Sequence, residues 1–443
     1  MNFLNEEIYD VIGIGFGPAG IALSVAMKDF EEGNPSDYLN LNCLFVEQAK
    51  DSTWMPEMLL PGTDIQHHYL RDLATPRNPR SRYTFPMYLK EKDRLFTFGQ
   101  FSSNPGRIEW SDYVKWVADQ VSENTLYRHK FLNVEPIVSS ETKAVEMVQV
   151  STQDLNTGAI KKFKARNIVL STGRRKNIPE ICKEFIGPRV FHSSGYKSHI
   201  KTVREKQPTF AVIGSGQNAI EIVLDLAHRF PQSKITSIHR GMGFRLYDLG
   251  HFSNEVYFPY FADYFYSVPK HKKKHLFEKI KHTNYSAVDA DVSRSLYWKI
   301  YEEGIQGINR IQVINNSELT TIGEKDKSFK LDVTDMYTQE KLKLDVDYII
   351  LCTGFYEEKF PSGLQPLSNY IELDEDEDLI ISQNYEVKTS ERFIPKIYVN
   401  GLTERTHGIS DAASFSMMAV KAGKIQESIQ SQLKNTRILQ EVE

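Results

Sequence analysis

The sequence predicts an α/β protein with two separate parallel-sheet units and a small, mainly helical segment. Three observations support this fold class. A glycine-rich turn joins an apolar strand to a helix near the N-terminus, and the same pattern returns at residues 209–227. Between 251 and 301 the chain instead contains aromatic-rich and helical pieces. Strands that alternate with helices are typical of parallel sheets covered by helices.

The first unit begins with an apolar strand at residues 8–14 and a helix at 21–27. Residues 31–40 are polar and contain Pro and Gly, which indicates a surface loop. A second apolar strand at 41–46 then completes a βαβ unit. Residues 54–104 are rich in Pro, Arg and aromatic side chains without a steady period, which predicts a long ordered loop packed over a site.

The remaining elements follow from hydrophobic periodicity. A helix is expected at 107–121 and a final helix at 416–439, and the basic run at 270–274 is expected to be solvated. Further strands are predicted at 147–150, 165–170, 209–213, 235–238, 348–352 and 397–399, with a helix at 219–227. The predicted boundaries are 1–205 with 345–443 for the first domain, 206–250 with 302–344 for the second, and 251–301 for the helical segment.

Composition narrows the range of partners. The 443 residues include 54 Lys and Arg against 58 Asp and Glu, a net charge of −4, so no basic field draws the chain to nucleic acid or anionic lipid. The apolar stretch at 11–27 follows acidic residues and contains several glycines, which argues against a signal or membrane segment. The three cysteines lie far apart in sequence and predict no disulfide, and we expect a cytoplasmic protein. His67-His68 has no accompanying ligand motif, so no metal site is predicted.

The first glycine-rich turn reads Gly15-Phe16-Gly17-Pro18-Ala19-Gly20. In this spacing Gly15 permits a tight turn, Gly17 lets the backbone approach a pyrophosphate, and Gly20 lets the helix pack closely on the strand. The N-terminus of that helix then faces the phosphate charge. Glu47 ends the next strand, where a carboxylate can accept hydrogen bonds from ribose hydroxyls.

The second turn reads Gly214-Ser215-Gly216-Gln217-Asn218-Ala219, with Ala at the third glycine position, as this fingerprint allows. No acid ends its next strand; His239-Arg240 stands there instead. A guanidinium suits a 2′-phosphate, although Arg240 read alone is also compatible with an ordinary surface arginine. One site for an unphosphorylated ribose and one for a phosphorylated ribose predict FAD in the first domain and NADPH in the second.

The fold class is therefore two Rossmann-like dinucleotide-binding domains, for FAD and NADPH, with a small and mainly helical substrate domain. Flavin-dependent disulfide reductases need two cysteines a few residues apart, and no such pair occurs. Oxygen is the remaining common acceptor for the electrons of a reduced flavin. These residues therefore favour a monooxygenase.

The sequence resembles the microbial N-hydroxylating monooxygenases, which act on lysine and ornithine in siderophore pathways, over almost its whole length. The resemblance implies FAD, NADPH and O₂, and N-hydroxylation of a terminal primary amine through a C4a-hydroperoxyflavin. The matching segments are residues 54–60, Gln66 with 70–79 (LRDLATPRNP), 83–89, 107–116, 190–196, Asn254-Glu255 with Phe258-Pro259, 283–289 (TNYSAVD), Thr353-Gly354-Phe355 and 406–411 (THGISD).

The resemblance also implies roles for individual residues. Gln66 and Asn284 are expected to act in catalysis, near both the cofactors and the substrate, and Asn254 at the backbone end of the substrate. Arg71 stands where the family has a lysine that pairs with the substrate carboxylate. The predicted cofactor residues outside the two turns are Glu47, Trp54, Gln66, Arg107, Arg240, Asn284, Thr353, Gly354 and Ser410, and Ser414 is a further predicted substrate residue.

The chain departs from the family at several of these places. His67 and His68 replace small or apolar residues, Met55 and Glu57 stand near the expected flavin, and the segment after Asp411 is one residue longer. Arginine keeps the charge of lysine but offers a longer, forked donor. L-ornithine and L-lysine are the leading substrates, and a diamine such as putrescine or cadaverine is the alternative.

Three other functions share parts of this pattern: an uncoupled NADPH oxidase, a Baeyer–Villiger or sulfur-oxidising monooxygenase, and a redox sensor that binds both cofactors without turnover. An oxidase would consume NADPH whether or not an amine is present. A Baeyer–Villiger or sulfur-oxidising monooxygenase would not need Asn254, Asn284 or a cation at position 71. A redox sensor would give neither hydrogen peroxide nor product. The resemblance also implies a homo-oligomer, either a dimer or a tetramer.

Overall fold

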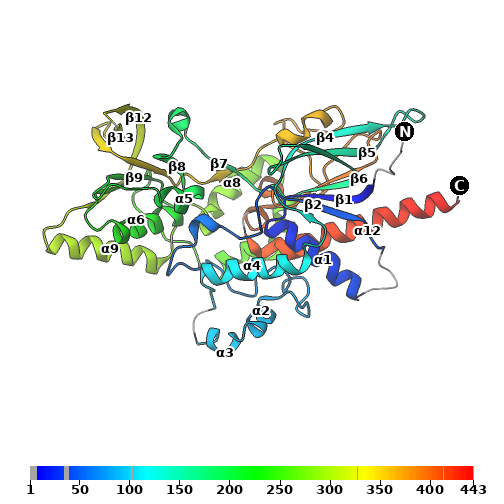
Figure 1. Ribbon diagram of the computed structural model, residues 1–443, viewed down its shortest axis with the longest axis horizontal. Coiled ribbons are helices and arrows are strands. Elements are labelled where there is room, and N and C mark those ends of the chain that lie inside the picture. Colours follow the sequence, from blue (N-terminus) through cyan, green and yellow to red (C-terminus); the bar gives the residue numbers. More distant parts are fainter. Residues whose placement is uncertain (1–6, 34–38, 101–102, 327, 413, 443) are drawn as a thin grey trace.

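The computed structural model describes residues 7–33, 39–100, 103–326, 328–412 and 414–442. Two α/β units lie side by side, one around β1 and the other around β9 (Figure 1). The described part of the chain contains no helix that is long and apolar enough to cross a membrane. Its three cysteines are free, which confirms the absence of a disulfide framework.

The first unit is a seven-stranded sheet with the order β3-β2-β1-β6-β5-β4, and β17 also pairs with β6. The strands β1, β2, β3, β6 and β17 run parallel, whereas β5 pairs antiparallel with β6 and β4 pairs antiparallel with β5. The strand bounds are β1 Ile8–Ile14, β2 Cys43–Val46, β3 Thr125–Leu126, β4 His129–Val138, β5 Val145–Asp154, β6 Ile160–Leu170 and β17 Lys396–Val399.

Three helices cover one face of this sheet: α1 (Pro18–Gly33), α4 (Arg107–Val121) and α12 (Met418–Val442) (Figure 1). The predicted strand at 8–14 and helix at 107–121 have the bounds of β1 and α4. The helix expected at 21–27 is longer at both ends. It starts at Pro18, since proline favours the first turn of a helix, and it runs to Gly33, into the segment predicted as a surface loop at 31–40. Its buried apolar side chains and those of α4 and α12 share one core.

The second unit is a five-stranded parallel sheet with the order β11-β10-β9-β15-β8, next to a three-stranded antiparallel sheet, β12-β13-β14. Helix α6 (Gln217–Arg229) follows β9 directly, as the sequence predicts. The strand bounds are β8 Val190–His192, β9 Phe210–Ile213, β10 Ile235–Ile238, β11 Ile311–Ile314, β12 Ser317–Lys325, β13 Ser328–Asp335, β14 Lys341–Val346 and β15 Tyr348–Leu351.

The sheet topology corrects the domain boundaries that the sequence predicts. Both β8 and β15 fall in the predicted first domain, but they pair with each other and β15 also pairs with β9 in the second sheet. The chain therefore crosses between the units after β6 and again after β15. The short strands β7 (Arg175–Lys176) and β16 (Phe355–Tyr356) pair antiparallel at these two crossings.

The segment at 251–301 is mainly helical, as predicted, and contains α7 (Pro259–Ser267), α8 (Lys270–Ile280) and the start of α9 (Ala290–Ile305). Residues 54–104 are largely turns, with two short helices, α2 (Phe85–Glu91) and α3 (Leu95–Phe98). The remaining short helices are η1 Pro56–Met58, η2 Glu180–Phe185, η3 Ser193–Gly195, α5 Tyr196–Ile200, η4 Ser253–Tyr257, η5 Lys281–Thr283, η6 Ser362–Leu367, α10 Glu404–His407, α11 Ile409–Ala412 and η7 Phe415–Met417.

Candidate active site

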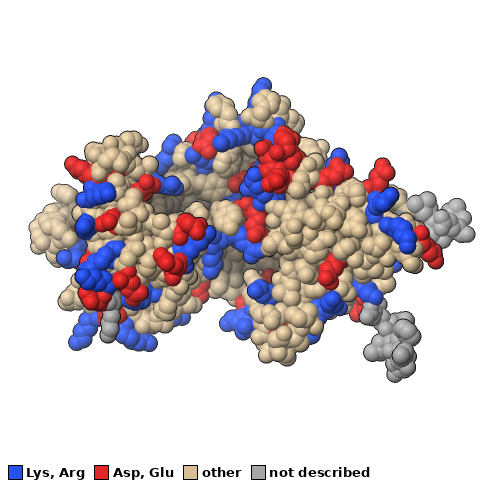
Figure 2. Space-filling view, turned by 90° about the horizontal axis from the view of Figure 1, so that it is seen from above, with Lys and Arg blue, Asp and Glu red and all other residues tan. Residues whose placement is uncertain are grey.

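A large cavity of about 2120 Å³ lies between the two units. The space-filling view shows the molecule hollowed there, with basic and acidic side chains along the rim (Figure 2). Both glycine-rich turns line this cavity, together with parts of the 54–71 loop, residues 282–287 and the 411–421 region. Segments that are far apart in sequence thus form one site large enough for two cofactors and a substrate.

The first turn has the geometry that a dinucleotide requires. Gly15 has φ +99°, and a Cβ at this position would lie 2.3 Å from the carbonyl oxygen of Ser171. A Cβ at Gly17 would meet no atom within 4 Å, so the backbone there is open to the cavity. Gly20 lies behind the cavity, where a Cβ would meet the Gly15 carbonyl at 2.3 Å. Pro18 starts α1 and also lines the cavity.

Glu47 lies at the carboxyl end of β2 and lines the same cavity. Its Oε2 accepts a hydrogen bond from the backbone N–H of Phe16 at 2.7 Å, and its Oε1 accepts one from Ala49 at 2.8 Å. These contacts fix the carboxylate beside the turn. Because an ionised carboxylate has about four acceptor sites, two remain for hydroxyl groups. The residues of this turn therefore fit an FAD ribose and pyrophosphate.

The second turn repeats this backbone arrangement. Gly214 has φ +137°, and a Cβ there would lie 2.3 Å from the carbonyl oxygen of Cys352, while Gly216 is open to the cavity. Gln217, Asn218 and Ala219 start α6 and line the cavity. Arg240 follows β10 and is exposed, and it has no carboxylate partner among the described residues. The start of α6 and the Arg240 guanidinium therefore fit a phosphorylated nucleotide.

Arg107 lines the cavity, but its guanidinium is engaged within the protein. It forms a buried, bidentate ion pair with Glu221 of α6, at 2.6 and 2.7 Å, and also donates to the carbonyl oxygens of Met58 and Asp64. Gln217 donates to Glu221 and accepts from the backbone of Asp289. These contacts join α4 of the first unit to α6 of the second. They favour a structural role for Arg107 over direct contact with a cofactor.

The predicted substrate residues divide between the cavity wall and its surroundings. Gln66, Arg71, Asn284 and Ser414 line the cavity, whereas Asn254 does not. The Asn254 amide donates to the carbonyl oxygen of Leu249 at 2.9 Å. The guanidinium carbon of Arg71 lies 5.0 Å from the ring centroid of Tyr257. Among the residues that the structure describes, no carboxylate pairs with Arg71.

Of the other predicted cofactor residues, some line the cavity and one does not. Trp54, Thr353 and Gly354 line the cavity. Ser410 is completely buried outside the cavity lining, and its hydroxyl has no hydrogen-bond partner within the described chain. Of the segment after Asp411, Ala413 lies outside the described residues, and the Ser414 hydroxyl bonds to Ser416.

Comparison with known proteins identifies the family. The sequence profile of the L-lysine 6-monooxygenase/L-ornithine 5-monooxygenase family matches residues 7–357. The L-ornithine N(5)-monooxygenase of Arthroderma benhamiae is 32% identical over 96% of this chain and 89% of its own. The chain belongs to the lysine and ornithine N-monooxygenase family. It is an FAD- and NADPH-dependent flavoprotein of the N-hydroxylating monooxygenases, and the predicted fold class is confirmed.

Two solved structures of N-monooxygenases superpose over nearly the whole chain. The L-lysine 6-monooxygenase of Pseudomonas syringae has a TM-score of 0.86 at 38% identity, covering 96% of this chain and 99% of its own. The ornithine N-hydroxylase of Kutzneria sp. 744, in a structure with reduced FAD, NADP⁺ and L-ornithine, has a TM-score of 0.89 at 29% identity, covering 96% and 100%. These two relatives act on amino acids that differ by one methylene.

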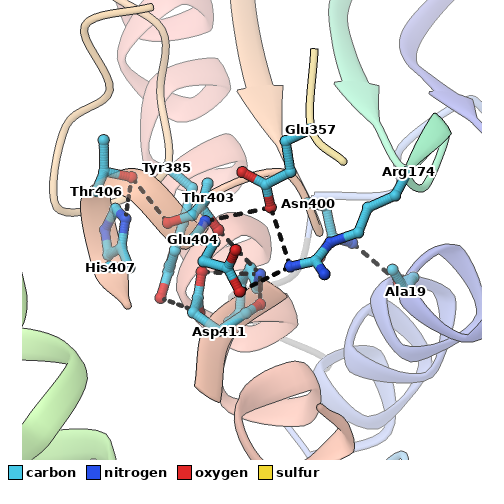
Figure 3. Close-up of polar contacts among 11 residues, drawn as sticks. Ala19, Arg174, Glu357, Tyr385, Asn400, Thr403, Glu404, Thr406, His407 and Asp411 are labelled. Atoms are coloured by element: carbon cyan, nitrogen blue, oxygen red, sulfur yellow. Dashed lines mark hydrogen bonds and ion pairs between the residues drawn. The ribbon is translucent and has the colours of Figure 1, made fainter. Parts of the chain in front are cut away.

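The structure also places polar groups at the cavity that the sequence does not predict for an N-monooxygenase. Arg174 lies 2.8 Å from Glu404 and 3.6 Å from Glu357 (Figure 3). Tyr285 donates its hydroxyl to Glu404. Burial and the nearby Glu404 carboxylate raise the pKa of Glu357 to about 7, against the opposing charge of Arg174. The position of Tyr285 next to Asn284 in the TNYS segment was the only sequence signal for this cluster.

A second unpredicted group surrounds Asp411, which belongs to the THGISD segment. Its carboxylate accepts from the Tyr385 hydroxyl at 3.1 Å, and Thr403 also bonds to it (Figure 3). It also accepts from the buried ammonium of Lys421 at 2.9 Å. Burial opposes ionisation, but Lys421 and these hydrogen bonds hold the pKa of Asp411 below its ordinary value. This buried ion pair fixes the region that carries Ser410 and Ser414.

Proposed function

We propose that this enzyme N-hydroxylates the terminal primary amine of L-ornithine or L-lysine, with FAD, NADPH and O₂. The observation that supports an amino acid is Arg71, a half-buried guanidinium in the cavity wall without a carboxylate partner among the described residues. A partly desolvated charge is costly unless it is paired. The α-carboxylate of an amino acid would offset that cost, whereas a diamine would leave Arg71 unpaired and add a second cation.

The cofactor positions follow from the two turns. The first turn with Glu47 would hold FAD, and the second turn with Arg240 would hold NADPH. When bound, the flavin supplies the redox chemistry, because it takes up hydride from NADPH and activates oxygen for transfer to nitrogen. Gln66 and Asn284 line the same cavity, and their amides can both donate and accept hydrogen bonds to orient the substrate.

The reacting amine must be uncharged, because an ammonium has no lone pair. The half-buried Trp54 ring and the buried Phe415 ring lie edge to face, 5.4 Å apart, in the cavity wall. An aromatic wall of this kind excludes water and disfavours the charged form of an amine next to it. The cavity wall thus offers both a cation, Arg71, and apolar rings, which suits a substrate with one ionic end and one neutral end.

Product formation tests the proposal directly. Purified protein with FAD, NADPH and oxygen would be offered L-ornithine, L-lysine, putrescine and cadaverine separately, and hydroxylamine would be measured by iodine oxidation and by mass. We expect product from ornithine or lysine. Product from a diamine alone would overturn the amino-acid assignment, and NADPH oxidation with peroxide but without hydroxylamine would indicate an oxidase. One methylene changes binding by only about 1–3 kcal/mol, so ornithine and lysine must be compared by experiment.

Replacement of Arg71 tests the carboxylate contact. In Arg71→Ala we expect KM for the amino acid to rise roughly 10- to 100-fold, the value of one charge-assisted hydrogen-bond pair, with flavin content unchanged. Arg71→Lys keeps the charge and is the matched control, with a smaller rise. An unchanged KM in Arg71→Ala would remove the carboxylate role.

We further propose that the product is a hydroxamate precursor for a siderophore or a related natural product, made by a cytoplasmic homo-oligomer. The siderophore-related family supports the first part. Size-exclusion chromatography with light scattering measures the oligomeric state.

A further inference from the structure

We infer that His67 is a substrate-binding residue: its Nε2 accepts a hydrogen bond from an N–H of the reacting amine. This inference rests on the proposed N-hydroxylation. His67 directly follows Gln66, and both side chains line the cavity.

The tautomer follows from one contact. Nδ1 of His67 lies 3.1 Å from the backbone carbonyl oxygen of His68. A carbonyl oxygen only accepts, so Nδ1 must carry the proton, and in a neutral imidazole Nε2 then carries the lone pair. Burial of the ring lowers its pKa to about 4, with the charge of Arg71 acting in the same direction, so the ring is neutral at the pH of the cytoplasm. Among the described residues, the ring makes its hydrogen bond through Nδ1 and none through Nε2.

Two aromatic neighbours hold the ring in place. The His67 ring meets Trp110 edge to face with centroids 5.0 Å apart, and it lies tilted against Phe415 at 5.5 Å. Phe415 in turn packs against Trp54, the residue predicted to lie at the flavin. The acceptor is therefore fixed on the side of the cavity where we place the flavin, while Arg71 lies where we place the substrate carboxylate.

A neutral acceptor at this place suits the chemistry. An uncharged amine can donate one N–H to Nε2 and keep its own lone pair free to attack oxygen. A carboxylate would instead stabilise the ammonium and raise the pKa of the amine, which would suppress the reactive form. Because the pKa of His67 is low, the ring does not compete for the proton that the amine must lose.

The test uses two variants of His67 and one of its neighbour. His67→Phe keeps an aromatic ring between Trp110 and Phe415 but removes the lone pair, and His67→Gln restores an acceptor oxygen. His68→Phe is the matched control, since His68 stacks on Tyr69 with centroids 4.4 Å apart and is absent from the cavity lining. Two quantities would be measured: amino-acid binding to the FAD- and NADP⁺-loaded protein by calorimetry, and the fraction of NADPH oxidation that yields hydroxylamine rather than peroxide.

For His67→Phe we expect binding of the preferred amino acid to weaken about 5- to 30-fold, the value of one hydrogen bond, and the hydroxylamine fraction to fall. His67→Gln should recover part of both losses, and His68→Phe should match the wild type. Binding and hydroxylamine fraction equal to the wild type in His67→Phe would overturn the inference, as would equal losses in His67→Phe and His68→Phe. If His67→Phe does not fold, wild-type values in an acceptor-free His67→Leu variant would overturn it instead.

The two proposals fail in different ways. If the wild-type protein makes no hydroxylamine from any amine, the proposed function is wrong, whatever the variants do. If the wild type makes hydroxylamine and the acceptor-free variants behave like it, only the role of His67 is wrong.

Discussion

The two glycine-rich turns have the same backbone arrangement, but the strands that follow them end in side chains of opposite charge. At Gly15 and at Gly214 the space for a Cβ is taken by a carbonyl oxygen just beyond the end of a neighbouring strand, 2.3 Å away in both cases. Gly17 and Gly216 both open onto the cavity. The units differ after the second strand, where one has a fixed carboxylate, Glu47, and the other an exposed guanidinium, Arg240. Backbone geometry thus defines a dinucleotide site, and one side chain favours a particular ribose.

The largest loss of unfolding free energy is expected from a change to the buried ion pair of Arg107 and Glu221, where the two units meet. Glu221→Leu would leave the guanidinium buried without its counter-charge, which typically costs about 3–5 kcal/mol of unfolding free energy. Denaturant unfolding followed by circular dichroism measures this loss. We also expect NADP⁺ binding to weaken, because Gln217 loses its acceptor at the start of α6.

Two control variants test whether the loss of stability comes from the unpaired buried charge. Asp119→Leu breaks the exposed pair of Lys115 and Asp119 on the same helix as Arg107, and it should cost no more than about 1 kcal/mol. The double variant Arg107→Met/Glu221→Leu removes both buried charges and should recover much of the stability. A single variant no less stable than Asp119→Leu would contradict a structural role for the buried pair.

The next largest loss of stability is expected at Gly15, where a Cβ has no space, and not at Gly17 of the same turn, where it has. Gly15→Ala places a methyl group against the Ser171 carbonyl in a left-handed backbone conformation, and we expect a loss of roughly 2–4 kcal/mol and of bound FAD. Gly17→Ala has open space, so its apoprotein should keep wild-type stability and lose only affinity for FAD. Unfolding of the apoproteins and flavin content of the purified proteins measure both. Equal stability of the two variants would show that the turn tolerates a Cβ at either position.

The comparison also explains which features the sequence could predict. A glycine turn, the strand before it and the helix after it are set by neighbouring residues, so β1, α6 and the position of Glu47 follow from short-range pattern alone. The pairing of Arg107 with Glu221 joins residues 114 positions apart, and nothing near either residue indicates it. The same holds for β15, which looks like any other apolar strand and whose sheet is decided by tertiary packing.

The contacts of several lysine side chains do not follow from the sequence. The basic run at 270–274 is predicted to be solvated, and this is confirmed for all of its members except Lys273, the one that is not exposed. Lys270 lies 2.6 Å from both Asp374 and Asp376, and Lys273 is half-buried and donates to the carbonyl oxygen of Thr406 at 2.8 Å. These contacts attach α8 to the first unit. Lys421, alone among apolar neighbours on α12, likewise gave no sign that it is buried against Asp411.

The smallest of these effects tests the charge difference between the turns. Arg240→Ala should raise KM for NADPH roughly 10- to 100-fold, because a charge-assisted contact to the 2′-phosphate contributes about 1.5–3 kcal/mol. KM for NADH, which lacks that phosphate, should stay within about twofold, so the ratio of the two constants reports the contact itself. Arg245 is the competing donor, since it is exposed, lines the same cavity and has no carboxylate partner in the described part of the chain. A selective rise for NADPH in Arg245→Ala, with none in Arg240→Ala, would move the phosphate contact away from the end of β10. It would also end the parallel between Glu47 and Arg240, because the charge that selects the second nucleotide would then come from a loop rather than from the strand end.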